Sequence, residues 1–346
     1  MRIVVADSQV PFVTGGAESL ARNLVAALRA AGHTVELVTL PFRWFPPHEV
    51  LNGVLAARLV DLSGCAAGPI DRVIGLRFPS YCVHHPDKVV WVLHQHREAY
   101  DLWGTTYGSL AAVPGGEAVR SSIVRADREF LGEARRVYTI SRNVSARLSR
   151  FNGIDSTPLY HPPPDHESLH SGASEDFLFF PSRIAPLKRQ DLAVEALRHA
   201  PPGTRLVVAG AAESPADADR LARLVDAVGV ADRVTLLGPV SRNEVLDLYA
   251  RCRAVVFPPF DEDYGYVTLE AFYAGKPVLT CTDSGGPLEF VRDGETGVVA
   301  EPSPDALGEA IGRLDRDGAR RLGHNARDLV DSLDLSWARV VAELLG

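Results

Sequence analysis

Apolar and polar positions along the chain follow two periods, one typical of buried parallel strands and one typical of helices that pack on one side. Ala254–Phe257 is a short apolar run of the first kind, and Leu20, Leu24 and Leu28 share one helical face before the stop at Gly32. Strand and helix patterns alternate from end to end, which predicts a parallel α/β architecture. The other predicted strands are Arg2–Ala6, Val35–Leu40, Asp71–Leu76, Lys88–Leu93, Phe177–Pro181, Arg205–Ala209 and Arg233–Leu237, and Ala274–Leu279 predicts a helix stop followed by a new strand. Further helices are predicted at Gln190–His199 and Ser336–Leu345.

A composition break divides this series in two. Tyr160–Ser174 is rich in proline and then in small polar residues, as interdomain linkers are. A chain of 346 residues is comfortable for two domains. We therefore expect one Rossmann-like domain at 1–165 and a second at 166–325.

Composition narrows the class of protein. The hydrophobic content of 46% and the charged content of 23% are those of a globular protein, and no apolar run is long enough to span a membrane. The N-terminus runs directly into a strand pattern without the apolar region of a signal peptide, so a cytoplasmic location is expected. A net charge of −8 disfavours nucleic-acid binding. The cysteines lack metal-ligand spacing, which predicts neither a metal site nor a disulfide; they are Cys65, Cys82, Cys252 and Cys281.

Positive charge is concentrated in one segment. Residues 120–150 hold eight arginines against three acidic residues, a net of +5 that leaves −13 for the rest of the chain. A basic surface of this kind predicts peripheral contact with the inner face of a membrane or with an anionic acceptor. A solvated helix face is the alternative.

The strongest candidates for ligand-binding residues lie near the end of a predicted strand in the second half of the chain. Glu262 follows the strand Ala254–Phe257, and Glu270 lies about one turn into the helix that follows Gly265. Ligands of open α/β sheets bind at such strand ends, where a helix N-terminus offers free N–H groups. Arg183 and Lys188 leave the carboxyl end of another predicted strand and suit a diphosphate. Solvent-exposed charge is the alternative for each.

Three further features lie in the first half. Gly15-Gly16 opens a helix and allows close approach to an anion, with a simple tight turn as the alternative. His94 and His96 follow a strand, where a metal site is geometrically possible, but hydrogen bonding or proton transfer by His94 is favoured. The aromatic and proline-rich loop 41–53 is interpreted as an acceptor-contacting lip.

These motifs, taken in order, resemble those of the family 4 retaining glycosyltransferases, which have the GT-B fold. The resemblance covers nearly the whole second half and scattered points of the first. It rests on Gly15-Gly16, His94, Arg183 with Lys188, Glu262 with Glu270, and the Gly285-Gly286 loop. The chain departs from the family pattern at Ser182, at Asp263-Tyr264-Gly265 and at Arg189, where a glycine often follows the lysine.

The resemblance implies roles for individual residues. Glu262, His94, Arg183 and Lys188 would be catalytic, with the two cations neutralising the donor diphosphate in place of a metal. Glu270 would hold the ribose. The remaining donor contacts would come from Gly15, Gly16, Val240 and the segment of Tyr264, Gly265, Tyr266 and Val267.

The resemblance also implies an architecture and a reaction. The two Rossmann-like domains would face each other across a cleft, with the helical segment 326–346 crossing back to the N-terminal domain. The enzyme would move a sugar from a nucleoside diphosphate, UDP before GDP, to a hydroxyl acceptor, with retention and without a metal or other cofactor. The leaving phosphate would help to deprotonate the acceptor. The alternatives are a GT-B epimerase, a catalytically silent sugar-nucleotide-binding protein and, more distantly, a dehydrogenase, which the missing G-x-G-x-x-G disfavours.

Overall fold

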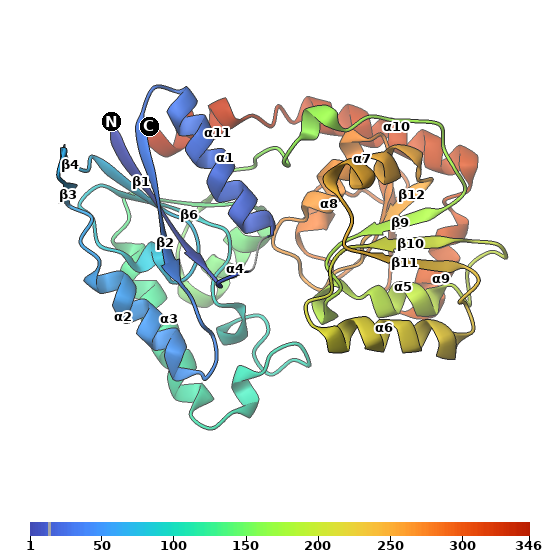
Figure 1. Cartoon of the computed structure of the whole chain (residues 1–346), viewed down its shortest axis with the longest axis horizontal. Coiled ribbons are helices and arrows are strands. Elements are labelled where there is room, and N and C mark those ends of the chain that lie inside the picture. Colours follow the sequence, from blue (N-terminus) through green and yellow to red (C-terminus); the bar gives the residue numbers. More distant parts are fainter. Residues whose placement is uncertain (13–14) are drawn as a thin grey trace. The chain divides into compact units, whose positions relative to one another are not determined.

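The structure is a computed structural model that describes residues 1–12 and 15–346 (Figure 1). The chain forms two compact units. The first comprises Met1–Pro164 together with Ser336–Gly346, and the second comprises Asp165–Leu335.

The first unit is built on a parallel six-stranded sheet with the order β2-β1-β5-β6-β7-β8. Strand β2 pairs with one edge of β1 and strand β5 pairs with the other. The strand order therefore reverses between β1 and β5. The strands are β1 Arg2–Gln9, β2 Thr34–Pro41, β5 Arg72–Gly75, β6 Lys88–Val92, β7 Arg136–Thr139 and β8 Thr157–Pro158, and a separate antiparallel pair joins β3 Gly64–Cys65 to β4 Gly68–Pro69. The helices are α1 Gly16–Ala30, α2 His48–Leu59, α3 Gly116–Gly132, α4 Arg142–Asn152 and α11 Trp337–Leu345.

The apolar pattern explains this packing. All five residues of β6 are buried, as the continuous apolar run of a central parallel strand predicts. Leu20, Leu24 and Leu28 of α1 are also buried, which confirms the helical face expected from their spacing.

The C-terminal helix α11 packs within the first unit. Val340 and Leu344 are fully buried, and the Trp337 ring meets Trp91 edge to face at 6.3 Å. Carbonyls near the helix end are satisfied by the sheet, since Arg72 donates to the Leu344 carbonyl at 3.0 Å and the Tyr138 hydroxyl donates to that of Glu343 at 2.9 Å.

The second unit repeats the architecture with a parallel sheet of order β11-β10-β9-β12-β13-β14. Here the order reverses between β9 and β12. The strands are β9 Leu178–Pro181, β10 Leu206–Ala209, β11 Val234–Gly238, β12 Ala254–Val256, β13 Val278–Cys281 and β14 Gly297–Ala300. The helices are α5 Gln190–Ala196, α6 Pro215–Val228, α7 Arg242–Arg251, α8 Tyr266–Tyr273, α9 Pro304–Gly312 and α10 Arg316–Ser332.

The structure and the sequence pattern differ in a few places. Short strands that begin with a polar or glycine residue, β7, β8 and β14, were not assigned from sequence. The structure places residues 326–335 in the second unit, because Ala326 and Val330 of α10 are buried there, and the chain returns to the first unit only at Ser336. Across the described ranges, no helix combines the length and apolar character that crossing a membrane requires.

Candidate functional site

The predicted site residues of the second unit surround its switch point. Strands β9 and β12 are paired in parallel through Leu178–Ala254 and Phe179–Val255. Their carboxyl ends therefore lie at the same edge of the sheet, and the segments that follow, residues 182–189 and 257–265, leave that edge together. This is the position at which open α/β sheets bind ligands.

Two of the predicted residues form an ion pair at this edge. Lys188 Nζ lies 2.5 Å from Glu262 Oε2, and both side chains are about one-fifth exposed. The backbone of Glu262 is held on both sides, because its N–H donates to the Ser284 carbonyl at 3.0 Å and its carbonyl accepts from the Gly286 N–H at 2.7 Å. A cation and a carboxylate thus stand side by side, partly open to solvent, on a fixed loop.

Glycines allow this loop to turn into α8. Gly265 adopts a φ of +82° directly before the helix. A Cβ on Gly286 would lie 2.8 Å from the Tyr264 carbonyl oxygen, so only glycine permits the two loops to approach this closely. The N–H groups of Tyr266 and Val267 lie in the first turn of α8, where helix N–H groups lack intrahelical acceptors. The arrangement can accept an anion at the helix start.

Glu270 is buried in α8 but lies in a polar setting. The Tyr249 hydroxyl donates to Oε2 at 2.9 Å, and Arg242 Nη1 lies 2.8 Å from Oε1. Burial raises the pKa of Glu270, although the charge of Arg242 and both donors act in the opposite direction. Each carboxylate oxygen retains acceptor capacity after these contacts, so the group remains able to accept ribose hydroxyls. Sequence reasoning missed Arg242; its only signal is its place directly after Ser241, the N-cap of α7.

The remaining predicted residues of this unit are more peripheral. Arg183 is half-exposed and lies 3.7 Å from Glu213 in the loop after β10. Its carbonyl accepts a hydrogen bond from the Gln190 amide at 2.8 Å, which fixes the backbone but leaves the guanidinium at the surface. Val240 lies between β11 and α7, two residues before Arg242.

Arg189 explains one departure from the family pattern. It adopts the left-handed conformation, with a φ of +56°, that a glycine would take at this position. Its buried guanidinium donates to the Pro258 and Pro259 carbonyls at 2.7 and 2.8 Å and pairs with Asp283 at 2.6 Å. The side chain therefore ties together both segments that leave the switch point, and sequence reasoning did not assign it this role.

We expect Arg189→Gly to destabilise the second unit by about 1–3 kcal/mol, because several charge-assisted hydrogen bonds are lost. Arg189→Ala should cost about a further 1 kcal/mol, since only glycine adopts the positive φ without strain. Urea denaturation of the full chain measures both differences. A glycine variant as stable as the unmodified protein would show that the Arg189 contacts contribute nothing.

The first unit carries a buried ion cluster at its own switch point. Arg77, which follows β5, pairs with Asp7 of β1 at 2.8 Å and with Glu18 of α1 at 2.6 Å. The second oxygen of Glu18 accepts the Gly15 N–H at 2.7 Å, and α1 begins at Gly16. Burial tends to raise the pKa of Glu18, but Arg77 outweighs it and the pKa is lowered. The predicted Gly15-Gly16 turn is thus held by Glu18 of α1, which is in turn held by Arg77 after β5.

The residues that follow His94 are hydrogen-bonded to a buried carboxylate. Its Nδ1 lies 3.0 Å from the Gln95 carbonyl, which can only accept, so Nδ1 carries the proton and Nε2 of the neutral ring is an acceptor. The Gln95 amide and the Tyr100 hydroxyl both donate to the buried carboxylate of Asp127, at 2.8 and 2.7 Å. Asp127 therefore holds both ends of the segment 95–100, which begins directly after His94.

The second histidine of the pair, His96, lies among aromatic rings. His96 packs against Phe42 and Phe78, with ring centroids 6.1 and 5.7 Å apart, and burial lowers its pKa to about 4. Within residues 1–12 and 15–346, no group of three or more His, Cys, Asp and Glu side chains is arranged to hold a metal ion.

Comparison with known proteins gives this geometry a context. Residues 163–329, which include almost all of the second unit, match the family model of glycosyl transferases group 1. The chain is related to the glycosyltransferases. D-inositol 3-phosphate glycosyltransferase from Nocardia farcinica is 29% identical over 281 residues, which cover 74% of this chain but only 61% of that relative's length.

Solved structures of other proteins share the architecture. HepE from Anabaena, in a complex with UDP and glucose, superposes with a TM-score of 0.71 at 17% identity, over 100% of this chain and 99% of that one. Sucrose-phosphate synthase from Thermosynechococcus elongatus gives a TM-score of 0.79 at 20% identity, over 99% and 97% of the two chains. These similarities show that the chain has the GT-B fold, as the resemblance of its motifs implied.

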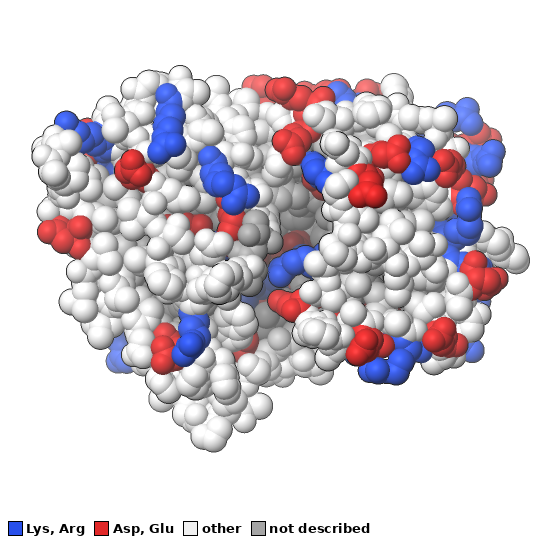
Figure 2. All heavy atoms as spheres, in the orientation of Figure 1, with Lys and Arg blue, Asp and Glu red and all other residues white. Residues whose placement is uncertain are grey.

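Two of the eight arginines in the segment 120–150 make structural contacts within the first unit. Arg147 is buried and lies 3.2 Å from Asp101, and Arg120 donates to the Ala99 carbonyl while it stacks over Trp103. These two arginines thus help to hold the first unit together, and the other six arginines of the segment are exposed. Acidic and basic side chains are interspersed on the face shown in Figure 2.

Proposed function

We propose that this protein is a family 4 glycosyltransferase that moves a sugar from a nucleoside diphosphate to a hydroxyl acceptor, with retention of configuration and without a metal ion. The observation that carries the proposal is the pairing of Lys188 with Glu262 at the β9–β12 switch point, with Glu270 presented by Tyr249 and Arg242 on the next helix. A donor that spans these groups would have its diphosphate at the cation and its ribose at the carboxylate.

Each residue of the site then has a chemical task. Lys188 and Arg183 stabilise the negative charge that builds on the diphosphate as the glycosidic bond breaks, which is the stage where such stabilisation accelerates the reaction most. Glu262, together with the N–H groups from Tyr264 to Val267, orients the sugar and its phosphate. On donor binding the phosphate replaces Glu262 as a partner of Lys188, and Glu262 turns to sugar hydroxyls.

The acceptor side is assigned to the first unit. The Gly15-Gly16 turn, in which the Gly15 N–H is held by Glu18, brings its backbone close to the donor phosphates, and His94 contacts the transferred sugar. No carboxylate is assigned as a nucleophile; retention follows from attack on the face that the leaving phosphate vacates, and that phosphate takes the acceptor proton. We propose a cytoplasmic location for this reaction.

The proposed donor is a UDP-sugar, with a GDP-sugar as the second choice. Support comes from HepE, whose structures contain UDP, UDP with glucose, and UDP-glucose. Support for transfer, rather than binding alone, comes from the Nocardia farcinica relative, which is a D-inositol 3-phosphate glycosyltransferase.

Thermal unfolding of the full chain with a panel of nucleoside diphosphate sugars, all in EDTA, tests the donor site. A donor at 100 times its Kd should stabilise the protein by about 2.7 kcal/mol, which corresponds to a shift of a few degrees. We expect a selective rise with one UDP-sugar, and we expect Glu270→Gln to reduce it, because the neutral amide accepts ribose hydroxyls less strongly.

Product analysis then separates the alternatives. Slow hydrolysis of the donor with retained anomeric configuration is the expected background of a retaining transferase without its acceptor. Conversion of one sugar nucleotide into another would identify an epimerase, and binding without any turnover would identify a silent binding protein. Absence of a shift with every donor in EDTA would overturn the metal-free donor site.

A further inference from the structure

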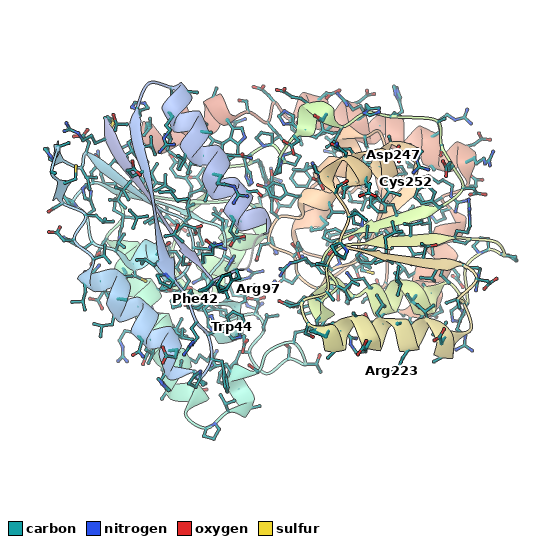
Figure 3. All side chains as sticks on the ribbon, viewed as in Figure 1. Phe42, Trp44, Arg97, Arg223, Asp247 and Cys252 are labelled. Carbon is teal, nitrogen blue, oxygen red and sulfur yellow. The ribbon has the colours of Figure 1, made fainter. Side chains whose placement is uncertain are left out.

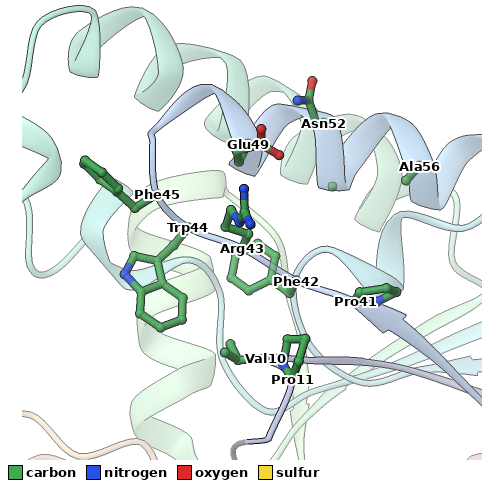
Figure 4. A pocket seen from close by; sticks show the side chains of 11 residues that line it. Val10, Pro11, Pro41, Phe42, Arg43, Trp44, Phe45, Glu49, Asn52 and Ala56 are labelled. Carbon is green, nitrogen blue, oxygen red and sulfur yellow. The ribbon is translucent and has the colours of Figure 1, made fainter. Parts of the chain in front are cut away.

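A cavity lies in the first unit, at the carboxyl ends of β1 and β2. It has a volume of about 610 Å³ and is lined by Val10 and Pro11 directly after β1, by the last residue of β2 with the segment that follows it, and by one side of α2 (Figure 4). None of the residues assigned to donor or catalysis lines it. Its position at strand ends is one where α/β sheets bind ligands.

One aromatic ring forms a rigid part of the cavity wall. The Phe42 N–H donates to the Gln9 carbonyl at 2.9 Å, which continues the β1–β2 pairing by one residue. Its ring packs edge to face against Phe78 at 6.0 Å, and Gly53 of α2 lies close enough that a Cβ there would touch it at 3.6 Å. Phe42 therefore does not depend on a ligand for its position.

Two other aromatic rings of the lining are open to solvent. Trp44 is 48% exposed and Phe45 is 64% exposed, and both follow Phe42 in the segment between β2 and α2 (Figures 3 and 4). Large aromatic side chains that remain exposed around a cavity mark a surface that a partner covers.

Polar groups of the lining are planar and carry no net charge between them. They are the guanidinium of Arg43, the carboxylate of Glu49 and the amide of Asn52. Arg43 extends toward α2, which carries the other two (Figure 4). Glu49 lies in the first turn of α2, where it already offsets the partial positive charge of the helix N-terminus.

We propose that this cavity binds the uncharged polyhydroxylated ring of the acceptor, either a sugar or a cyclitol. The inference rests on the proposed function, because it names the substrate class for the acceptor side of the same reaction. The apolar C–H face of such a ring packs on the exposed indole of Trp44, and the planar polar groups form paired hydrogen bonds with adjacent ring hydroxyls.

The same lining disfavours the two competing classes. A phosphorylated ring would bring negative charge to Glu49, and among the described residues that line the cavity Arg43 is the one permanent cation that could compensate it. A lipid chain would cover Arg43, Glu49 and Asn52 without offering them hydrogen bonds, which is costly for polar groups.

Binding of free rings to the full chain, without donor, tests the proposal. The probes are methyl glycosides of neutral hexoses, myo-inositol and inositol phosphate, followed by ligand-observed saturation-transfer NMR. We expect binding of at least one neutral ring in the millimolar range, and whether glycosides or myo-inositol bind separates sugar from cyclitol. Trp44→Ala should weaken that binding at least tenfold. The matched control is Leu55→Ala, which removes an exposed apolar side chain of α2 that does not line the cavity and should leave binding unchanged.

Three results would overturn the proposal. They are absence of binding by every neutral ring, equal binding by the Trp44→Ala variant, and tighter binding of inositol phosphate than of the neutral rings. A Glu49→Gln variant that binds inositol phosphate better than the unmodified protein, while neutral rings still bind best to the latter, would support the charge argument. Because Trp44 is half-exposed, its replacement should leave the thermal midpoint almost unchanged.

The donor experiment keeps the two proposals distinguishable. If Trp44→Ala retains the donor-induced thermal shift but no ring binds to the unmodified protein, only the acceptor inference fails. If rings bind to the first unit but no donor shifts the midpoint, the proposed function fails, and the cavity is a sugar-binding site of a different protein class.

Discussion

Lys188→Ala is expected to lower sugar transfer by a factor on the order of 10²–10³, because a charged donor at the leaving phosphate is lost where negative charge develops. Protein stability should change little, since the Lys188–Glu262 pair is partly exposed and such pairs contribute weakly to folding. Steady-state kinetics with the donor identified by thermal unfolding measure the effect. The loss should fall mainly on kcat, because the interaction strengthens in the transition state.

A matched control separates this effect from a general change in charge. Arg223→Ala removes an exposed cation from α6, outside the loops that leave the switch point (Figure 3). It should leave kcat and KM within about twofold of the unmodified protein, since exposed charges at a distance are largely screened by salt. Full activity of Lys188→Ala, or an equal loss in both variants, would refute the assignment of Lys188 to the diphosphate.

Asp127→Ala is expected to destabilise the first unit by about 3 kcal/mol or more. The carboxylate accepts hydrogen bonds from Tyr81, Tyr100 and Gln95 at 2.9, 2.7 and 2.8 Å, and it is completely buried. Its removal leaves three buried donors without this acceptor and opens a cavity. Urea denaturation followed by tryptophan fluorescence measures the change, with Glu129→Ala on the exposed side of the same helix as the control.

The size of this loss should depend on pH. Burial raises the pKa of Asp127 to about 6 from its ordinary 3.8. The folded protein therefore takes up a proton between these values that the unfolded chain does not, so acidification from pH 7 to 4 favours the folded state at this residue. The difference in stability between the unmodified protein and Asp127→Ala should grow by about 2–3 kcal/mol over that range. A difference that is independent of pH would show that Asp127 is already ionised or already neutral throughout.

The same substitution links stability to the site. Gln95 directly follows His94 and Tyr100 lies six residues after it, and both donate hydrogen bonds to Asp127. We therefore expect the folded fraction of Asp127→Ala to transfer sugar less efficiently as well, by misplacing His94 rather than by removing a group that contacts substrate.

Much of the fold was predictable because its signal is local. The apolar runs of β6, β9 and β12 and the helical face of α1 are repeated within short windows, and the structure has each element close to its predicted bounds. The strands that were missed are short and begin with residues such as Arg136 or Gly297, so they carry little apolar signal. Their place in the sheet is fixed by neighbouring strands rather than by their own sequence.

The candidate site was also predictable only in its local features. The amino-acid sequence by itself determined which residue types stand at strand ends and helix starts: Lys188, Glu262, Glu270 and the Gly15-Gly16 turn. Only the tertiary structure decided their partners. The pairing of Arg242 with Glu270, the Arg189 contacts across two loops, and the support of Gly15 by Glu18 and Arg77 join segments far apart in the chain. Spacing along a sequence encodes periodicity within one element, whereas these contacts depend on which strand ends meet at the sheet edge, and that is set by strand order.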